Sequence, residues 1–285
     1  MKVLRSAAGV ACLVIFLFSL QANVSSCKKE IIRDTLIVRD TVHVKDTVHI
    51  TDSSTCNCYN LADGLIAYYN FTGGNLNDSS GNGNHIILNN ATKTTDRFGK
   101  PNNAYLFNGV NSYMQVKNSA TLNPTNISIS AVVKLNGFYA GNCHGNQILQ
   151  KGTVDQTTGV YSLRVSDLYN DCAVTADTAK EQINGFYGDY GHTSGAVDNS
   201  YTHTNKWINV VYTFDGLVSK LYVDGVLKNT SNGSAVFNNN GNDVFIGRAE
   251  SAQYPYWFNG VMDEIRIYNK ALCEGAVKQL YSLKN

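Results

Sequence analysis

Short hydrophobic runs that alternate with polar residues follow one another along most of the chain, from about residue 59 to residue 269. Side chains of a β-strand point alternately to opposite faces, so a period of two predicts strands with one buried face. Asn, Gly and Asp fill the intervals between the runs, as is usual in turns. The pattern predicts strands within residues 64–71, 104–116, 127–135, 147–152, 160–166, 206–216, 219–229, 243–250 and 258–269.

Two local signals refine this pattern. Asp224-Gly225 lies between two alternating runs and predicts a tight hairpin turn. Residues 273–283 have helical periodicity, with Ala276, Leu280 and Leu283 on one side. Because no helical segments separate the strands, the pattern favours an antiparallel sandwich over parallel βαβ units.

A six-residue unit is repeated three times between residues 33 and 50, as RDTLIV, RDTVHV and KDTVHI. An even period keeps the Val, Ile and Leu positions mainly on one side of an extended strand. Fully extended, this segment spans about 60 Å, which suits a stalk. We expect it to self-associate through its apolar side, because a lone strand cannot bury that side. Its Asp-Thr-apolar triplets resemble a bacterial O-glycosylation signal on Thr35, Thr41 and Thr47.

The N-terminus is typical of an exported lipoprotein. Lys2 and Arg5 precede an apolar run that ends at Leu20, which is short for a membrane span and suitable for a signal peptide. Val24-Ser25-Ser26-Cys27 resembles a lipobox, so residues 1–26 are the predicted signal peptide and Cys27 the lipid-attachment site. Lys28 after the cysteine favours the outer membrane, with exposure at the cell surface. Cleavage to a soluble secreted protein is the alternative.

The composition excludes one class of partner. The 285-residue chain has a formal net charge of +1, and only 16% of its residues are charged. Because Lys and Arg form no cluster outside the repeat, we expect no nucleic-acid partner. A 43% hydrophobic share is ample for a core.

Several ordered segments carry a family resemblance: "GLIAYYNFTGGNLNDSSGNGN", "DRFGKPNNAYLFNGVNSYMQV", "KWINVVYTFDGLVSKLYVDGVL" and "DVFIGRAE…FNGVMDEIRIYNKAL". They resemble laminin-G-like, pentraxin-related domains of the concanavalin A-like lectin/glucanase superfamily. The resemblance covers residues 59–285 and implies an all-β, two-sheet antiparallel jelly roll whose first and last strands lie close together. Residues 27–58 then form the anchor and stalk. In this fold the expected inward-facing residues are Trp207, Phe214, Tyr222 and Ile246.

Seven cysteines fit an oxidising compartment. Cys143 and Cys172 lie in one loop-rich insertion and are expected to pair. The adjacency of the first and last strands makes a bridge from Cys56 or Cys58 to Cys273 plausible, and we take Cys58 as the partner. The tight spacing of Cys56 and Cys58, with no second CxxC, argues against zinc.

Hydrolysis is not expected from this sequence. The chain contains five Glu, and none has a carboxylate two residues away, as paired catalytic carboxylates on one strand require. No Gly-x-Ser-x-Gly elbow is present. We therefore predict a protein that is not an enzyme.

Two features favour binding. By resemblance to laminin-G-like domains, a structural calcium ion is expected at Asp78 and Asp263, assisted by backbone carbonyls near Asn82 and Asn108. The alternative is that both Asp residues only shape turns. Aromatic residues in segments 183–195 and 251–258 suit stacking on sugar rings, with packing beneath loops as the alternative. The predicted ligand-binding residues are Tyr187, Tyr190, His192, Tyr254, Tyr256 and Trp257.

The sequence thus predicts a surface-anchored lectin-like module that binds a glycan or a surface protein. The alternative is a structural subunit of a cell-surface assembly that forms homo-oligomers through the repeat.

Overall fold

The computed structural model describes one folded domain and leaves the N-terminal segment outside. The chain divides into two units, Met1–Ser54 and Thr55–Asn285, and every described residue belongs to the second. The described ranges are 59–141, 144–152, 160–167, 181–188, 194–201, 204–235, 237 and 241–283. Predictions that fall outside them concern the signal peptide, the repeat, Cys27, Thr35, Thr41, Thr47, Cys58, Cys143, Cys172, Tyr190 and His192.

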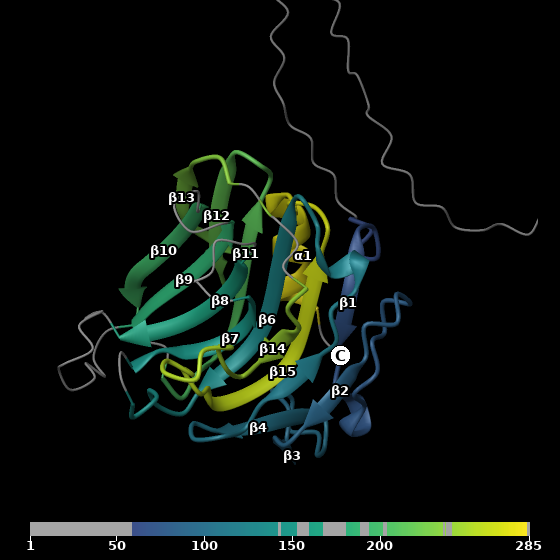
Figure 1. The fold of residues 1–285 in the computed structure, drawn as a ribbon, viewed down its shortest axis with the longest axis vertical. Coiled ribbons are helices and arrows are strands. Elements are labelled where there is room, and N and C mark those ends of the chain that lie inside the picture. The colour runs from purple at the N-terminus through teal and green to yellow at the C-terminus, as the bar shows by residue number, and fades with distance from the viewer. Residues whose placement is uncertain are drawn as a thin grey trace, which may run out of the picture. The chain divides into compact units, whose positions relative to one another are not determined.

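Two antiparallel sheets form a sandwich, which confirms the predicted all-β jelly roll (Figure 1). Eight strands form sheet A, in the order β13 (Val226–Asn232), β12 (Val218–Val223), β11 (Trp207–Phe214), β6 (Ile127–Leu135), β15 (Asn259–Tyr268), β4 (Ala104–Asn108) and β3 (Thr92–Thr94), with β1 (Leu65–Tyr69) also paired to β15. Seven strands form sheet B, in the order β10 (Ser194–Tyr201), β9 (Glu181–Gly188), β8 (Val160–Asp167), β7 (Asn146–Lys151), β14 (Val244–Ile246), β5 (Met114–Val116) and β2 (Ile86–Asn89). Short 3-10 turns occur at Thr72–Gly74 and Ala120–Leu122.

The main core lies between the sheets, where alternate residues of each strand meet. Phe214 and Ile246 are fully buried there, as predicted. Tyr222 is buried too, but it belongs to a second cluster. The prediction for Trp207 was wrong, because this residue is only partly buried and pairs in register with the outward-facing Lys134.

The helix α1 (Glu274–Ser282) covers part of the outer face of sheet A, where the sequence predicted a helix (Figure 1). Its buried residues Ala276, Val277 and Leu280 pack with Val211 and Tyr222 of the sheet. This second cluster explains why strand residues on the outer face are apolar. Within the described ranges no helix has the length and apolar character to cross a membrane.

Strands from the two ends of the domain pair with each other. β1 runs antiparallel to β15, with Leu65 opposite Tyr268 and Tyr69 opposite Ile265. The other half of β15 pairs with β4, and a bulge lies between Met262 and Glu264. The expected adjacency of first and last strands is therefore confirmed.

The Asp224-Gly225 hairpin has the predicted geometry. Val223 and Val226 face each other across the turn, and both turn residues have positive φ, 52° for Asp224 and 76° for Gly225. Asp and Gly tolerate this left-handed conformation better than most residues do, and it matches the twist of the flanking strands.

Four strands were not predicted: the short strands β2 and β3, and the longer strands β9 and β10. Residues 181–188 and 194–201 form β9 and β10, which pair in register from Ser194 opposite Tyr187. The segment expected to be one aromatic loop is therefore two strands of sheet B and a connection outside the described residues.

Candidate functional site

Tyr187 does not belong to a binding surface, contrary to the prediction. It lies on β9, is 1% exposed, and its hydroxyl donates to the carbonyl oxygens of Pro124 at 2.7 Å and Thr125 at 3.0 Å. Its ring packs 4.7 Å from the Phe214 ring, between centroids. Strand alternation turns this side chain inward, so it stabilises the core.

Tyr254, Tyr256 and Trp257 lie together in a loop after β14. The loop closes on itself through hydrogen bonds from Ala249 N to Pro255 O at 2.7 Å and from Phe258 N to Gly247 O at 2.9 Å. Gln147 N of β7 donates to Tyr256 O at 2.8 Å and ties the loop to sheet B. We call residues 248–257 the aromatic loop.

An arginine at the start of the aromatic loop is surrounded by three rings. Arg248 Cζ lies 4.8 Å from the ring centroid of Trp257, 5.2 Å from that of Tyr113 and 5.3 Å from that of Phe245. All four side chains are partly exposed. Cation–π attraction holds the guanidinium among the rings and fixes their positions. Arg248 also donates to Ala249 O and Glu250 O, at 2.7 and 3.1 Å.

A second arginine lies beside the predicted tyrosines. The rings of Tyr254 and Tyr256 stack with centroids 6.2 Å apart. Arg164 Cζ of β8 lies 5.7 Å from the Tyr256 ring centroid. On β9, Asn184 pairs with Arg164, which brings a partly exposed amide next to the guanidinium. The structure thus unites Tyr254, Tyr256 and Trp257 with four residues not predicted from the sequence: Tyr113, Arg164, Phe245 and Arg248.

Burial affects the charges of this region. It lowers the pKa of Arg164 and Arg248, yet an arginine stays protonated in proteins. Burial also raises the pKa of Glu250, and nearby Asp243 raises it further. Oε2 of Glu250 is buried without a hydrogen-bond partner among the residues that the structure describes. The surface thus combines partly exposed rings with fixed guanidinium donors.

Lys151, at the end of β7, gives a pH-dependent prediction. The side chain is fully buried, Nζ donates to Asn242 O at 2.7 Å, and burial lowers its pKa from 10.5 to about 8. The unfolded chain therefore binds more protons between these two values, and the contribution of Lys151 to stability rises with pH across that window. In Lys151→Met this increase of stability with pH is lost. Relative to wild type, the variant's free energy of unfolding should fall by up to about 3 kcal/mol from pH 7 to pH 10.

Urea unfolding at several pH values measures this difference. Lys117→Met is the matched control, because the Lys117 side chain is 73% exposed. A Lys151→Met difference that stays constant with pH, like that of the control, would show that Lys151 is not titrating in this window.

The predicted calcium ligands in the first loop already have protein partners. Oδ1 of Asp78 accepts from Tyr68 N and Ser80 N, and Oδ2 accepts from Ser80 Oγ and Asn84 N, all at 2.8 to 3.0 Å. Asn82 donates its amide to Leu65 O at 3.0 Å. These bonds fix the loop after β1 in the way an Asx turn does.

The remaining two predicted ligands also have partners of their own. Asn108 Oδ1 accepts from the backbone N–H groups of residues 110, 111 and 112. Asp263 is 2% exposed and forms an ion pair with Arg97 at 2.8 Å. The carboxylates of Asp78 and Asp263 thus have protein partners, and the described residues include no group of three His, Cys, Asp or Glu side chains suited to a metal ion. Calcium binding itself stays an untested prediction.

Cys273 precedes α1 and is a free, exposed thiol in the structure. Tyr59, the residue after Cys58, is held at the same helix, because its backbone N–H donates to Gln279 Oε1 at 2.9 Å and its carbonyl accepts from Gln279 Nε2 at 3.2 Å. Cys58 lies outside the described residues, so the bridge to Cys273 stays a prediction.

Sequence comparison agrees with the fold. The family model described as the concanavalin A-like lectin/glucanases superfamily matches residues 108–278, more than half of the chain. The chain belongs to this superfamily. A search of curated proteins finds no match to the chain.

Solved structures with a similar fold include domains of larger proteins. Domain 4 of AbnA, an extracellular arabinanase from Geobacillus stearothermophilus solved with arabinotriose, is 20% identical, with a TM-score of 0.52 over 76% of this chain and 98% of that domain. The binding domain of Paraclostridial Mosquitocidal Protein 1 is 15% identical, with a TM-score of 0.58 over 77% of this chain. That of botulinum neurotoxin DC, in complex with SialylT, is 14% identical, with a TM-score of 0.57 over 78% of this chain. The chain spans about half of each toxin domain, 52% and 51%.

The superfamily name covers both lectins and glucanases. Glycosidases cleave with a pair of carboxylates, and two carboxylates are neighbours in the interior of this domain. Asp263 and Glu264 are neighbours on β15, and both are buried. Arg97 pairs with Asp263, and Arg266 pairs with Glu264 at 3.1 Å. Burial raises the pKa of Asp263, while Arg97 lowers it. These contacts make the two carboxylates part of a charge network on sheet A.

Proposed function

We propose that the domain is a non-catalytic carbohydrate-binding module whose binding surface is the aromatic loop and the adjacent outer face of sheet B. The observation that carries this proposal is the gathering of Tyr254, Tyr256 and Trp257, half exposed, around Arg164 and Arg248. The likeness to a domain solved with arabinotriose supports it at the level of the fold.

The chemistry of a sugar explains why these residue types suit the surface. One face of a sugar ring presents C–H groups that pack on an aromatic ring, and its edge presents hydroxyls that donate and accept. Guanidinium groups supply several donors in a fixed plane, and the amide of Asn184 both donates and accepts. Because the loop is tied to β7 and closed by its own hydrogen bonds, little ordering is required on binding.

The absence of catalysis is also part of this proposal. What supports it is the arginine pairing of Asp263 and Glu264, which leaves neither carboxylate of the pair without a counter-charge. Surface display through lipid on Cys27 rests on the sequence of residues 1–27. The alternative of a self-associating structural subunit rests on the repeat, which lies outside the described residues.

Replacing Trp257 by alanine tests the binding surface. Binding of the full chain to a glycan array, followed by calorimetry with arabinotriose and with the strongest array ligand, gives the affinities. We expect Trp257→Ala to weaken binding at least about tenfold, since a lost stacking contact of roughly 1.4 kcal/mol changes the affinity by that factor.

Leu217→Ala is the matched control, because Leu217 is a large side chain, 68% exposed, in the β11–β12 turn. It should bind like wild type. If no glycan on the array binds the wild-type chain, or if Trp257→Ala and Arg248→Met bind as tightly as wild type, the proposal is wrong.

A further inference from the structure

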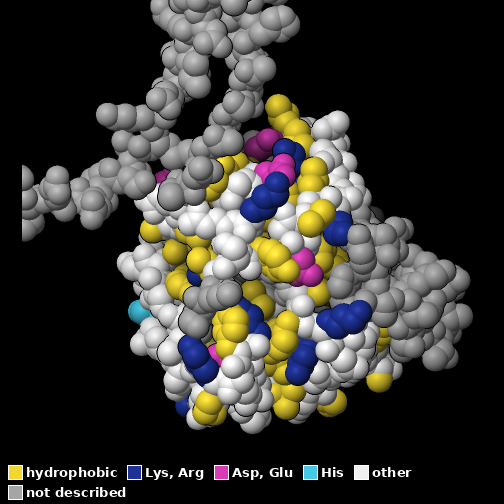
Figure 2. Space-filling model, turned by 180° about the vertical axis from the view of Figure 1, so that it is seen from behind, with side chains coloured by type: hydrophobic (Ala, Val, Ile, Leu, Met, Phe, Trp, Pro, Cys, Tyr) yellow, Lys and Arg dark blue, Asp and Glu magenta, His cyan; other side chains and the backbone are white. Residues whose placement is uncertain are grey.

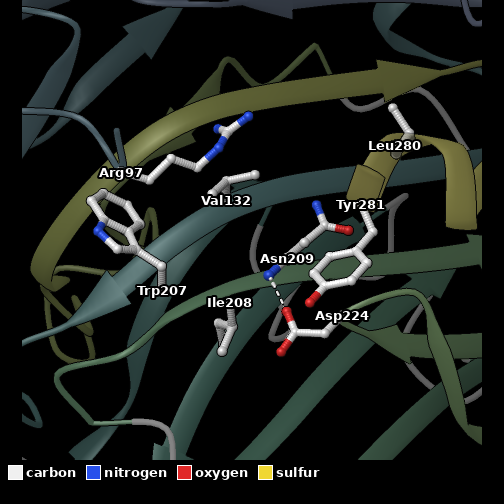
Figure 3. A pocket seen from close by; sticks show the side chains of 8 residues that line it. All are labelled: Arg97, Val132, Trp207, Ile208, Asn209, Asp224, Leu280 and Tyr281. Atoms are coloured by element: carbon white, nitrogen blue, oxygen red, sulfur yellow. Dashed lines mark hydrogen bonds between the residues drawn. The ribbon is translucent and has the colours of Figure 1, made fainter. Parts of the chain in front are cut away.

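A small cavity lies on the outer face of sheet A, at the C-terminal end of α1 (Figure 3). Its volume is about 80 Å³. β11 supplies one wall, Val132 of β6 the floor and the end of α1 the other wall. Its lining includes the side chains of Arg97, Val132, Trp207, Asn209, Asp224 and Tyr281. None of them belongs to the aromatic loop, which lies against sheet B.

Asn209 brings an unsatisfied acceptor to this cavity. The residue is 6% exposed, and its backbone N–H donates to Asp224 Oδ1 at 2.8 Å. Its Nδ2 donates to Ser130 Oγ at 3.4 Å, but Oδ1 is buried with no hydrogen-bond partner among the described residues. Figure 3 shows this amide beside the Tyr281 ring. A buried acceptor without a partner is unfavourable, so a ligand that donates a hydrogen bond there gains affinity.

Two aromatic rings lie on opposite sides of Asn209 (Figure 3). Trp207 is an aromatic residue of β11 that alternation directs outward, and Lys134 Nζ lies 5.4 Å from its ring centroid. Tyr281, 54% exposed, is the last aromatic residue of α1. A partly buried ring and an exposed ring thus flank a buried polar group, and aromatic residues around a few polar groups are typical of ligand pockets.

The charges around the cavity select the class of ligand. Arg97 and Lys134 disfavour a cation, although Asp263 compensates part of the Arg97 charge. Asp224 and the Asn209 oxygen disfavour an anion. Figure 2 shows one face of the molecule on which Lys and Arg side chains lie among hydrophobic ones. A neutral ligand that has hydroxyl donors, acceptors and a C–H face meets none of these penalties.

We infer that this cavity binds one neutral sugar residue, stacked on the exposed ring of Tyr281, with a hydroxyl donating to Asn209 Oδ1. The inference rests on the proposed function and extends it. The aromatic loop lies against sheet B and this cavity lies on the outer face of sheet A, so the domain holds two glycan sites on opposite layers. One domain then bridges two glycan chains.

The test is the stoichiometry of binding to the full chain, measured by calorimetry with neutral oligosaccharides, including arabinotriose. We expect two sites in the wild type. Asn209→Leu removes the acceptor and keeps the branched shape of the side chain, and Tyr281→Ala removes an exposed ring. Each should weaken binding at this cavity at least tenfold and leave the site at the aromatic loop unchanged. Trp257→Ala should leave one site, and the double variant Asn209→Leu/Trp257→Ala none. Leu217→Ala keeps two.

Circular dichroism and thermal unfolding confirm that each variant is folded, and Tyr281→Ala keeps the test valid if Asn209→Leu is unstable. A single wild-type site that Trp257→Ala abolishes and Asn209→Leu and Tyr281→Ala leave unchanged overturns this inference and leaves the proposed function intact. A wild-type chain that binds no sugar overturns both.

Discussion

Tyr187→Ala should destabilise the domain by about 3–5 kcal/mol, the usual loss when a buried aromatic side chain is truncated. The ring fills the space between Phe214 and Phe237, with centroids 4.7 and 5.3 Å away. Its removal leaves a cavity between the two sheets, and the carbonyls of Pro124 and Thr125 lose their donor. Urea unfolding followed by tryptophan fluorescence measures the loss.

Tyr187→Phe separates packing from hydrogen bonding. It keeps the ring and removes the hydroxyl, so the expected loss is only about 1–2 kcal/mol. Glycan affinity of this variant should equal that of wild type, since the side chain is 1% exposed. Loss of glycan binding at full stability would instead restore Tyr187 to a binding role.

Arg97→Met should be of similar severity, at about 3–5 kcal/mol, because it leaves buried charge without a partner. Arg97 Nη1 lies 2.8 Å from Asp263 Oδ2, and Nη2 lies 3.6 Å from Glu264 Oε2. The side chains of Asp263 and Glu264 are 4% and 3% exposed, so water cannot replace the arginine. Chemical unfolding at pH 7 gives the size of the loss.

The pH dependence of this variant has a definite sign. Burial raises the pKa of Asp263, and removal of Arg97 raises it further. A folded-state pKa above the unfolded value reduces stability once the pH rises above the unfolded value of about 4. The deficit of Arg97→Met should therefore be largest at pH 7 and smaller near pH 4.

Two further variants check the assignment. Arg97→Met/Asp263→Asn should recover part of the stability at pH 7. The exposed pair of Lys270 and Asp63 provides the control, and Lys270→Met should change stability by no more than about 1 kcal/mol. If the Arg97 deficit is equal at pH 4 and pH 7, the buried charge is not its cause.

The sandwich could be predicted from the sequence because alternation is a local signal, and most strands show it. The sequence did not predict β9 and β10, because the glycines of this segment are typical of a loop. Gly185 lies inside β9 for a different reason: a Cβ at this position would lie 2.0 Å from the Tyr212 ring. That requirement comes from packing against a strand of the other sheet, which no local pattern contains.

The candidate site was predicted only where its residues are neighbours in the sequence. Tyr254, Tyr256 and Trp257 form one aromatic segment, which is visible in the sequence. Arg164 reaches the same surface through the register of β8 with β7, and Tyr113 reaches it through its ring contacts with Phe245 and Trp257. Only the fold brings these two residues there. The alternation of residues 160–166 does place Arg164 on the face opposite Leu163, and this was the available signal.

The pairing of β1 with β15 determines how the domain carries mechanical load. Leu65 lies beside Tyr268, whereas the aromatic loop enters β15 at the far end, before Asn259. A pull on the chain before Leu65, opposed by a pull at the aromatic loop, draws the two antiparallel strands past each other lengthwise. The hydrogen bonds of the ladder run across that direction and share the force at once, instead of opening one after another. Tension applied between the N-terminal side of Leu65 and the aromatic loop therefore acts along the direction in which this ladder resists most.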